Sequence, residues 1–126
     1  MSAVLQRTIW GRVRQAKEVD MAWVYLLVAG GFEIVWATGL KYTDGFSRLW
    51  PSVGTVAAMS VSMVFLALAL RAIPIGTAYA IWTGIGAVGV AIMGIMLFNE
   101  PRDAMRLFFI FVIIAGIVGL KLSSTT

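Results

Sequence analysis

The residue best suited to chemistry in this sequence is a single carboxylate, Glu33, set inside a long apolar stretch. Residues 22–40 contain no other charged side chain. An ionised carboxylate in hydrocarbon costs several kcal/mol, and it is tolerated through protonation, a cationic partner or a water-filled cavity. Basic residues lie only near the ends of the apolar stretches, so a permanent internal ion pair is excluded. Glu33 is therefore predicted to bind a cation or a proton; the alternative is a protonated side chain that hydrogen-bonds to a neighbouring helix.

A group of polar and aromatic side chains could surround this carboxylate. Gly30 and Trp36 lie three residues before and after it, on the same face of a helix. Tyr79 and Trp82 share a face near the start of a later apolar stretch, and Ser62 lies at the middle of the stretch between. Aromatic faces attract cations, more strongly when water is excluded, so these residues are candidates for a substrate and proton site. Taken singly, each aromatic could instead pack against lipid, and the serine could bond to its own helix.

Small residues form two further patterns. The sequence beginning at Gly84 matches G-x-G-x-x-G, but it lies in an uncharged apolar run without a preceding strand, which excludes a dinucleotide site. Glycines in such a run permit a kink or close packing, so Gly84 and Gly86 are a candidate hinge, with simple packing as the alternative. Ala115 and Gly119, with Gly116 beside them, form a small-xxx-small pair that favours contact between helices, within or between subunits.

Several classes of function are excluded by composition. The sequence has no cysteine and no histidine, which removes disulfides, thiolate metal sites and histidine bases or ligands. No nucleophile–base pair or metal-ligand cluster is visible, so we expect neither an enzyme nor a metal or cofactor site. From Met21 onward six basic residues face four acidic ones, which argues against nucleic-acid binding because that function requires a basic stripe.

The elements that must position the carboxylate are four apolar segments. Of the 126 residues, 60% are hydrophobic and 13% are charged, whereas a soluble domain has about a quarter charged residues. So short a chain has too little interior to bury this excess. A spanning helix needs roughly 20 apolar residues, and the segments that meet or approach that length are residues 22–40, 53–70, 75–98 and 107–122. The predicted fold class is an all-α membrane protein, a bundle of four transmembrane helices.

Three short linkers join these segments, and each contains a basic residue and a proline that discourages helix continuation. Neighbouring helices must then be antiparallel, so the first and third run in the same direction and bring Glu33 and Trp82 to similar depth. From Met21 onward the two membrane sides carry two and four basic residues, and including residues 1–20 makes this six against four. Because Lys/Arg bias sets orientation, so weak a bias predicts a chain that can insert both ways.

Residues 1–20 differ in composition from the rest of the chain. We expect a disordered extension, or a segment that precedes a functional start at Met21. The alternative is an interfacial amphipathic helix, because apolar residues between Val4 and Ala16 could form a stripe with basic residues elsewhere. A cleaved signal peptide is not expected, since no small-residue cleavage site follows the first apolar run and further spans come after it.

Three stretches resemble a known family, the small multidrug resistance transporters. Residues 45–52 (GFSRLWPS) resemble the family's first loop, and residues 73–86 (IPIGTAYAIWTGIG) resemble the start of its third helix. Residues 30–37 (GGFEIVWA) resemble the guanidinium exporter subtype (Gdx, formerly SugE), because the quaternary ammonium subtype usually has a small residue in place of Trp36. The resemblance covers residues 21–126, the predicted transporter domain, and leaves residues 1–20 outside.

The resemblance implies an antiparallel, dual-topology homodimer in the inner membrane of a prokaryote, exchanging guanidinium for protons across the lipid bilayer. It implies that Glu33 carries both cations, with Trp36, Ser62, Tyr79 and Trp82 around it. We expect Ser62 to orient Glu33, Trp36 and Trp82 to wall the site, and Tyr79 to gate it or to hydrogen-bond to it. Two carboxylates facing each other in a homodimer would repel, and burial adds to this, so the protonated form is favoured and protons compete with substrate. Two rivals stay open: a broader exporter of quaternary ammonium and lipophilic cations, and a non-transporting accessory subunit.

Overall fold

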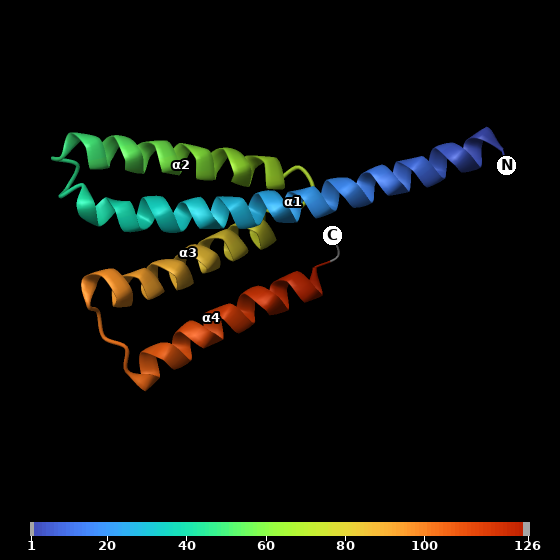
Figure 1. Ribbon diagram of the computed structural model, residues 1–126. Coiled ribbons are helices and arrows are strands. Elements are labelled where there is room, and N and C mark those ends of the chain that lie inside the picture. The colour runs from blue at the N-terminus through green and yellow to red at the C-terminus, as the bar shows by residue number, and fades with distance from the viewer. Residues whose placement is uncertain (1, 125–126) are drawn as a thin grey trace.

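The computed structural model describes residues 2–124, and these residues form an all-helical chain (Figure 1). Its elements are α1 (Ala3–Tyr42), α2 (Leu49–Ala69), α3 (Ile75–Phe98) and α4 (Ala104–Ser123). Each of these helices is long and apolar enough to cross a membrane. The predicted class, an all-α protein with four helices of spanning length, is therefore confirmed for the described residues. Residue 1 of the predicted extension and residues 125–126 of the predicted domain lie outside them.

Helix ends follow local capping. The third helix has the predicted bounds: Pro74 precedes its first residue, and Asn99 ends it in the left-handed conformation, with φ 53°. The second helix begins four residues before the predicted span, because Pro51 lies in its first turn, where no backbone N–H is needed. The fourth begins three residues early, because the Asp103 carboxylate accepts the Arg106 backbone N–H at 3.3 Å.

Residues 3–20 differ from the disordered extension that we expected, because they form the first half of α1. The helix continues without interruption from Ala3 to Tyr42, and Figure 1 shows its first half extending away from the other three helices. The Ser2 hydroxyl caps it by accepting the Leu5 N–H at 3.2 Å. The segment contains no proline and one glycine, and lengthening an existing helix avoids the cost of a new nucleus. Whether Met21 is the functional start is not tested by this helix.

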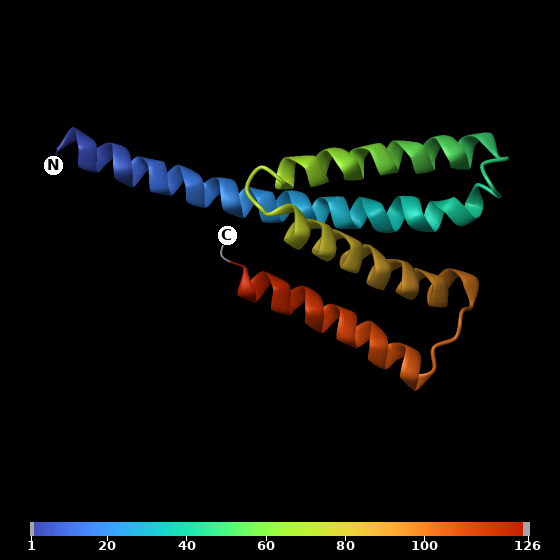
Figure 2. The same ribbon diagram turned by 180° about the vertical axis from the view of Figure 1, so that it is seen from behind.

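The helices pack in an uneven way. Figures 1 and 2 show neighbouring helices running in opposite directions, so α1 and α3 are parallel, as the short linkers predict. Among the described helices, α1 packs against both α2 and α3, whereas α4 packs along α3 and reaches α1 through Lys121, whose Nζ lies 5.2 Å from the centre of the Trp23 ring. The buried apolar core lies between the first three helices and consists of Ala22, Leu26, Ala29, Leu66, Ala69, Ile73, Ala78, Ile81 and Trp82. The core therefore supports the part of α1 that carries Glu33.

Candidate functional site

A single buried hydroxyl ties three helices together. Ser62 of α2 is completely buried, and its Oγ donates a hydrogen bond to the Ala29 carbonyl oxygen of α1 at 2.7 Å. The same Oγ accepts a hydrogen bond from the Trp82 Nε1–H of α3 at 3.0 Å. Ser62 is therefore not bonded to its own helix, and no hydrogen bond joins it to Glu33 within residues 2–124. We call this arrangement the Ser62 bridge.

Glu33 lies one helical turn beyond the Ser62 bridge. It follows Ala29 by four residues on α1, and it faces Gly86, which follows Trp82 by four residues on α3. Gly86 is buried, and a Cβ placed on it would lie 2.6 Å from each Glu33 carboxylate oxygen. No side chain other than hydrogen fits between the carboxylate and α3. The glycine thus makes the space that the carboxylate occupies.

Among the described residues, three buried side-chain polar atoms have no hydrogen-bond partner, and all three are on α1. They are the Glu33 Oε2, the Trp36 Nε1 about one turn further on, and the Thr38 Oγ1. The ion pair found among the described residues, Arg106 with Glu100, is in the α3–α4 region and leaves Glu33 without a basic partner. Buried polar groups are nearly always bonded, so an unpaired carboxylate oxygen in a spanning helix indicates a place where a cation or a proton binds.

The remaining predicted site residues divide into packing and surface positions. Gly30 is buried, and a Cβ on it would lie 2.7 Å from Ile85 Cγ2, so this glycine permits close packing of α1 against α3. The Tyr79 side chain is 55% exposed, and its ring centre lies 5.4 Å from that of Trp82. The structure therefore brings Glu33 close to Gly86 and Trp82 close to Ser62, with Tyr79 at the outer edge of Trp82.

The three glycines of the G-x-G-x-x-G pattern contact different neighbours. Gly86 faces Glu33, Gly89 faces Ile34 of α1, and Gly84 faces Ile117 of α4. In each case an added Cβ would approach the neighbouring side chain to less than 3 Å. The helix continues through all three positions, from Ile75 to Phe98. These contacts favour the packing alternative, and the hinge at Gly84 and Gly86 stays a prediction.

The small residues of α4 lie on an open surface. Ala115, Gly116 and Gly119 are exposed, and a Cβ on either glycine would meet nothing within 4 Å. No residue of α4 is buried. Among the described residues, the two glycines therefore leave space for the close approach of another helix.

Two features of the site were missed by sequence reasoning. The acceptor for Ser62 is the backbone carbonyl of Ala29, and no residue type marks a carbonyl that is used in this way. The second is the contact of Gly86 with the carboxylate. The sequence had suggested a hinge or simple packing for Gly86, and no contact with Glu33. Its four-residue spacing from Trp82 on a helix parallel to α1 was an available signal.

Comparison with known proteins identifies a matching family model and several similar bacterial proteins. The family model described as Small Multidrug Resistance protein matches residues 21–113. A guanidinium exporter from Escherichia coli (strain K12) is 61% identical over 104 residues, which make up 82% of this chain and 99% of that protein. Guanidinium exporters from Salmonella typhimurium and Citrobacter freundii are each 59% identical over 104 residues, with the same coverage. The matched family region includes every predicted site residue from Gly30 to Gly86.

Proposed function

This chain belongs to the small multidrug resistance protein family, and we propose that it exports guanidinium and small guanidinyl compounds in exchange for protons. The relatives described above are guanidinium exporters, which are transporters rather than enzymes. The observation that carries the proposal for this chain is the unpaired, buried Oε2 of Glu33. Glu33 is the acidic residue of the matched region that lies within a spanning segment.

The chemistry of a carboxylate suits this substrate. A planar guanidinium presents parallel N–H donors that match the two oxygens of a carboxylate, and such bidentate pairs are strong and geometrically specific. The Gly86 position leaves the carboxylate in contact with the backbone of α3, and the Ser62 bridge holds α1, α2 and α3 in register one turn away. Trp36 and Trp82 wall the site in this proposal, and the bulk of Trp36 discriminates against large cations.

Guanidinium and protons compete for the Glu33 carboxylate, and exchange of one for the other follows from this competition. Glu33 binds either guanidinium or a proton, so the cation leaves only when the carboxylate is protonated and the proton leaves only when the cation binds. The site opens to one membrane side with guanidinium bound and returns with protons. Burial strengthens both interactions by excluding water. Tyr79, at the edge of Trp82, is placed to gate access.

A second, oppositely oriented copy of the chain completes the pathway in this proposal. Glu33 is only partly buried within one chain, where its carboxylate faces Gly86 of α3. Four helices of this length are too few to wall a pathway sealed alternately on two sides. Inverted repeats are a common solution in transporters, and a chain with weak Lys/Arg bias supplies one by inserting both ways. The exposed Ala115, Gly116 and Gly119 then allow α4 helices to approach closely. The proposed location is the inner membrane of a prokaryote.

Electrical recording tests the transport proposal. The purified chain is reconstituted in liposomes, and currents are recorded with guanidinium and then with a large aromatic cation, under a proton gradient of either sign. The two Glu33 carboxylates of the proposed homodimer carry two protons for each guanidinium, so every cycle moves net charge. The proposal therefore expects guanidinium currents that reverse with the proton gradient, and little current with the large cation. Comparable currents with both cations would favour the broader exporter. No substrate-driven current at all would favour a non-transporting subunit.

Labelling of a single cysteine tests the topology. The sequence has no native cysteine, so Ser47→Cys in the exposed α1–α2 linker is the sole reactive thiol. A membrane-impermeant maleimide is applied to intact cells, and to inside-out vesicles, with permeabilised cells as the measure of total thiol. Labelling from both sides in comparable amounts supports dual topology. Labelling from one side alone contradicts it.

A further inference from the structure

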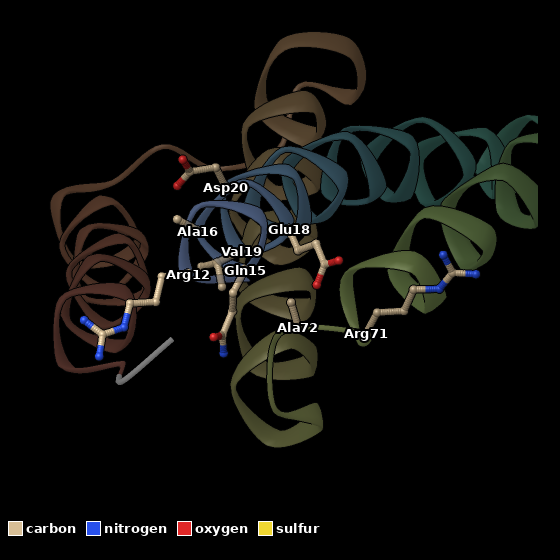
Figure 3. A pocket seen from close by; sticks show the side chains of 8 residues that line it. All are labelled: Arg12, Gln15, Ala16, Glu18, Val19, Asp20, Arg71 and Ala72. Atoms are coloured by element: carbon tan, nitrogen blue, oxygen red, sulfur yellow. The ribbon is translucent and has the colours of Figure 1, made fainter. Parts of the chain in front are cut away.

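Two adjoining cavities lie where α1 leaves the bundle, and both include Glu18, Arg71 and Ala72 in their walls. The larger, of about 610 Å³, is shown in Figure 3. The smaller, of about 370 Å³, has a basic part made by Arg14, Lys17 and Arg71 and an apolar part made by Met21, Tyr25 and Leu68. Its wall thus combines residues of α1, of the end of α2 and of the α2–α3 linker.

The positive charge in this smaller cavity is not neutralised by the chain. One carboxylate, Glu18, lines the cavity beside the three basic side chains. Within residues 2–124, no carboxylate forms an ion pair with Arg14, Lys17 or Arg71. Figure 3 shows the Arg71 guanidinium pointing away from Glu18. The cavity therefore presents a net positive charge to an outside ligand.

The cavity lies at the level of the lipid headgroups. The apolar part of α1 begins at Ala22, and at about 1.5 Å per residue Lys17 and Arg14 lie roughly 8 and 12 Å further out along the helix axis. The polar layer on each side of a bilayer is about 5–8 Å thick, so Lys17 lies at its outer boundary and Arg14 about one helical turn beyond it. Arg71 directly follows the end of α2. Lys17 and Arg71 thus meet the polar layer, while Tyr25 and Leu68 continue into the apolar spans.

We propose that this cavity binds the phosphate of an anionic phospholipid, with Arg14, Lys17 and Arg71 around the phosphate and the first part of an acyl chain along Tyr25 and Leu68. Charge complementarity selects an anion, and the apolar lower wall selects a lipid over a soluble anion or an acidic protein. Residues 1–20 lie outside the family match, so this site is a property of this chain and is independent of guanidinium export.

Native mass spectrometry of the full chain in detergent measures the lipid that it retains. Phosphatidylglycerol is titrated against phosphatidylcholine, and the variants are Arg14→Gln with Lys17→Gln, Arg71→Gln, and the control Arg7→Gln. Arg7 precedes Arg14 by two helical turns on the same face of α1, and it does not line the cavity. We expect phosphatidylglycerol to be preferred, and each cavity cation removed to weaken its retention roughly fivefold. Arg7→Gln should leave retention unchanged.

Several outcomes would overturn the proposal. Equal retention of the two lipids rejects an anion site. Equal loss in Arg7→Gln and in the Arg14/Lys17 double variant shows attraction by the basic helix as a whole rather than by the cavity. Displacement of the lipid by an equimolar acidic peptide or by inorganic phosphate assigns the site to a soluble ligand. Circular dichroism and guanidinium currents establish that each variant is folded, since none of these residues lies at the transport site.

Discussion

Around Ser62, the helices α1, α2 and α3 bury their contact faces and close a hydrogen-bonded group inside them, whereas α4 lies against α3 with no buried residue. The first region contains the apolar core and Glu33. The second is held by Ile117 against Gly84 and by the Glu100–Arg106 ion pair.

This difference between the two regions indicates that α1, α2 and α3 are held in fixed relative positions more firmly than α4 is. In a membrane, helices associate through close packing and interhelical hydrogen bonds, because lipid is as apolar as the helices themselves. Between α1, α2 and α3 the Ser62 bridge provides the interhelical hydrogen bonds, and Gly86 and Gly89 of α3 permit the close packing. Within the described residues, α4 contacts α3 and, through Lys121, the Trp23 ring of α1. Its exposed small residues are available to lipid or, as we propose, to a second copy.

The largest effect in this comparison is expected for Glu33→Gln. We expect proton-coupled guanidinium flux to be abolished while the protein still folds, because the amide cannot carry the charge or release the proton. Liposome currents measure it. Glu100→Gln is the matched control, since it removes a carboxylate from the α3–α4 region instead. Substantial coupled flux in Glu33→Gln would reject the carboxylate as the shared site.

Gly86→Ala tests whether the carboxylate needs the space beside α3. The added Cβ would lie 2.6 Å from both Glu33 oxygens, so Glu33 must move. We expect guanidinium affinity to fall on the order of tenfold, which corresponds to about 1.4 kcal/mol. Gly76→Ala is the control, because a Cβ there meets nothing within 4 Å. Equal affinities of the two variants would mean that the carboxylate position is not critical.

The sequence predicted some of these features and not others, for physical reasons. A segment of apolar residues long enough to span the membrane is recognisable in the sequence. Pro74 and Asn99 mark the two ends of α3, because neither has the backbone conformation of an α-helix. Glu33 was recognisable because a charge in such a segment is costly. Contacts between helices are different: the partner of Ser62 and the neighbour of Gly86 depend on how α1–α3 rotate about their axes, which periodicity does not determine. A helix over residues 3–20 was only the alternative to a disordered extension, because it gains its order from continuity with α1 rather than from its own composition.

Ser62→Ala measures the contribution of the bridge. It leaves the Ala29 carbonyl and the Trp82 N–H without their partner, and an interhelical hydrogen bond in a membrane contributes about 0.6 kcal/mol on average. We expect guanidinium affinity to fall a few-fold, less than in Glu33→Gln, with a shift in the pH dependence of transport. Ser60→Ala is the control, because the Ser60 hydroxyl bonds to the Val56 carbonyl of its own helix. An unchanged affinity and pH profile would make the bridge purely structural.

The smallest expected effect belongs to the α3–α4 region, and Arg106→Gln tests it. The Arg106 Nη2 lies 2.9 Å from Glu100 Oε1, with side chains 32% and 39% exposed. Exposed ion pairs contribute about 0–1 kcal/mol, and the Glu100 backbone N–H still bonds to the Gly94 carbonyl at 3.1 Å in the variant. We therefore expect a stability loss below about 1 kcal/mol and unchanged guanidinium affinity, measured by thermal unfolding in detergent and by liposome currents. Arg102→Gln is the control, since it removes an exposed cation from the α3–α4 linker without breaking an ion pair among the described residues. A stability loss well above about 1 kcal/mol would contradict the comparison, because α4 would then be held within the chain more firmly than an exposed ion pair allows.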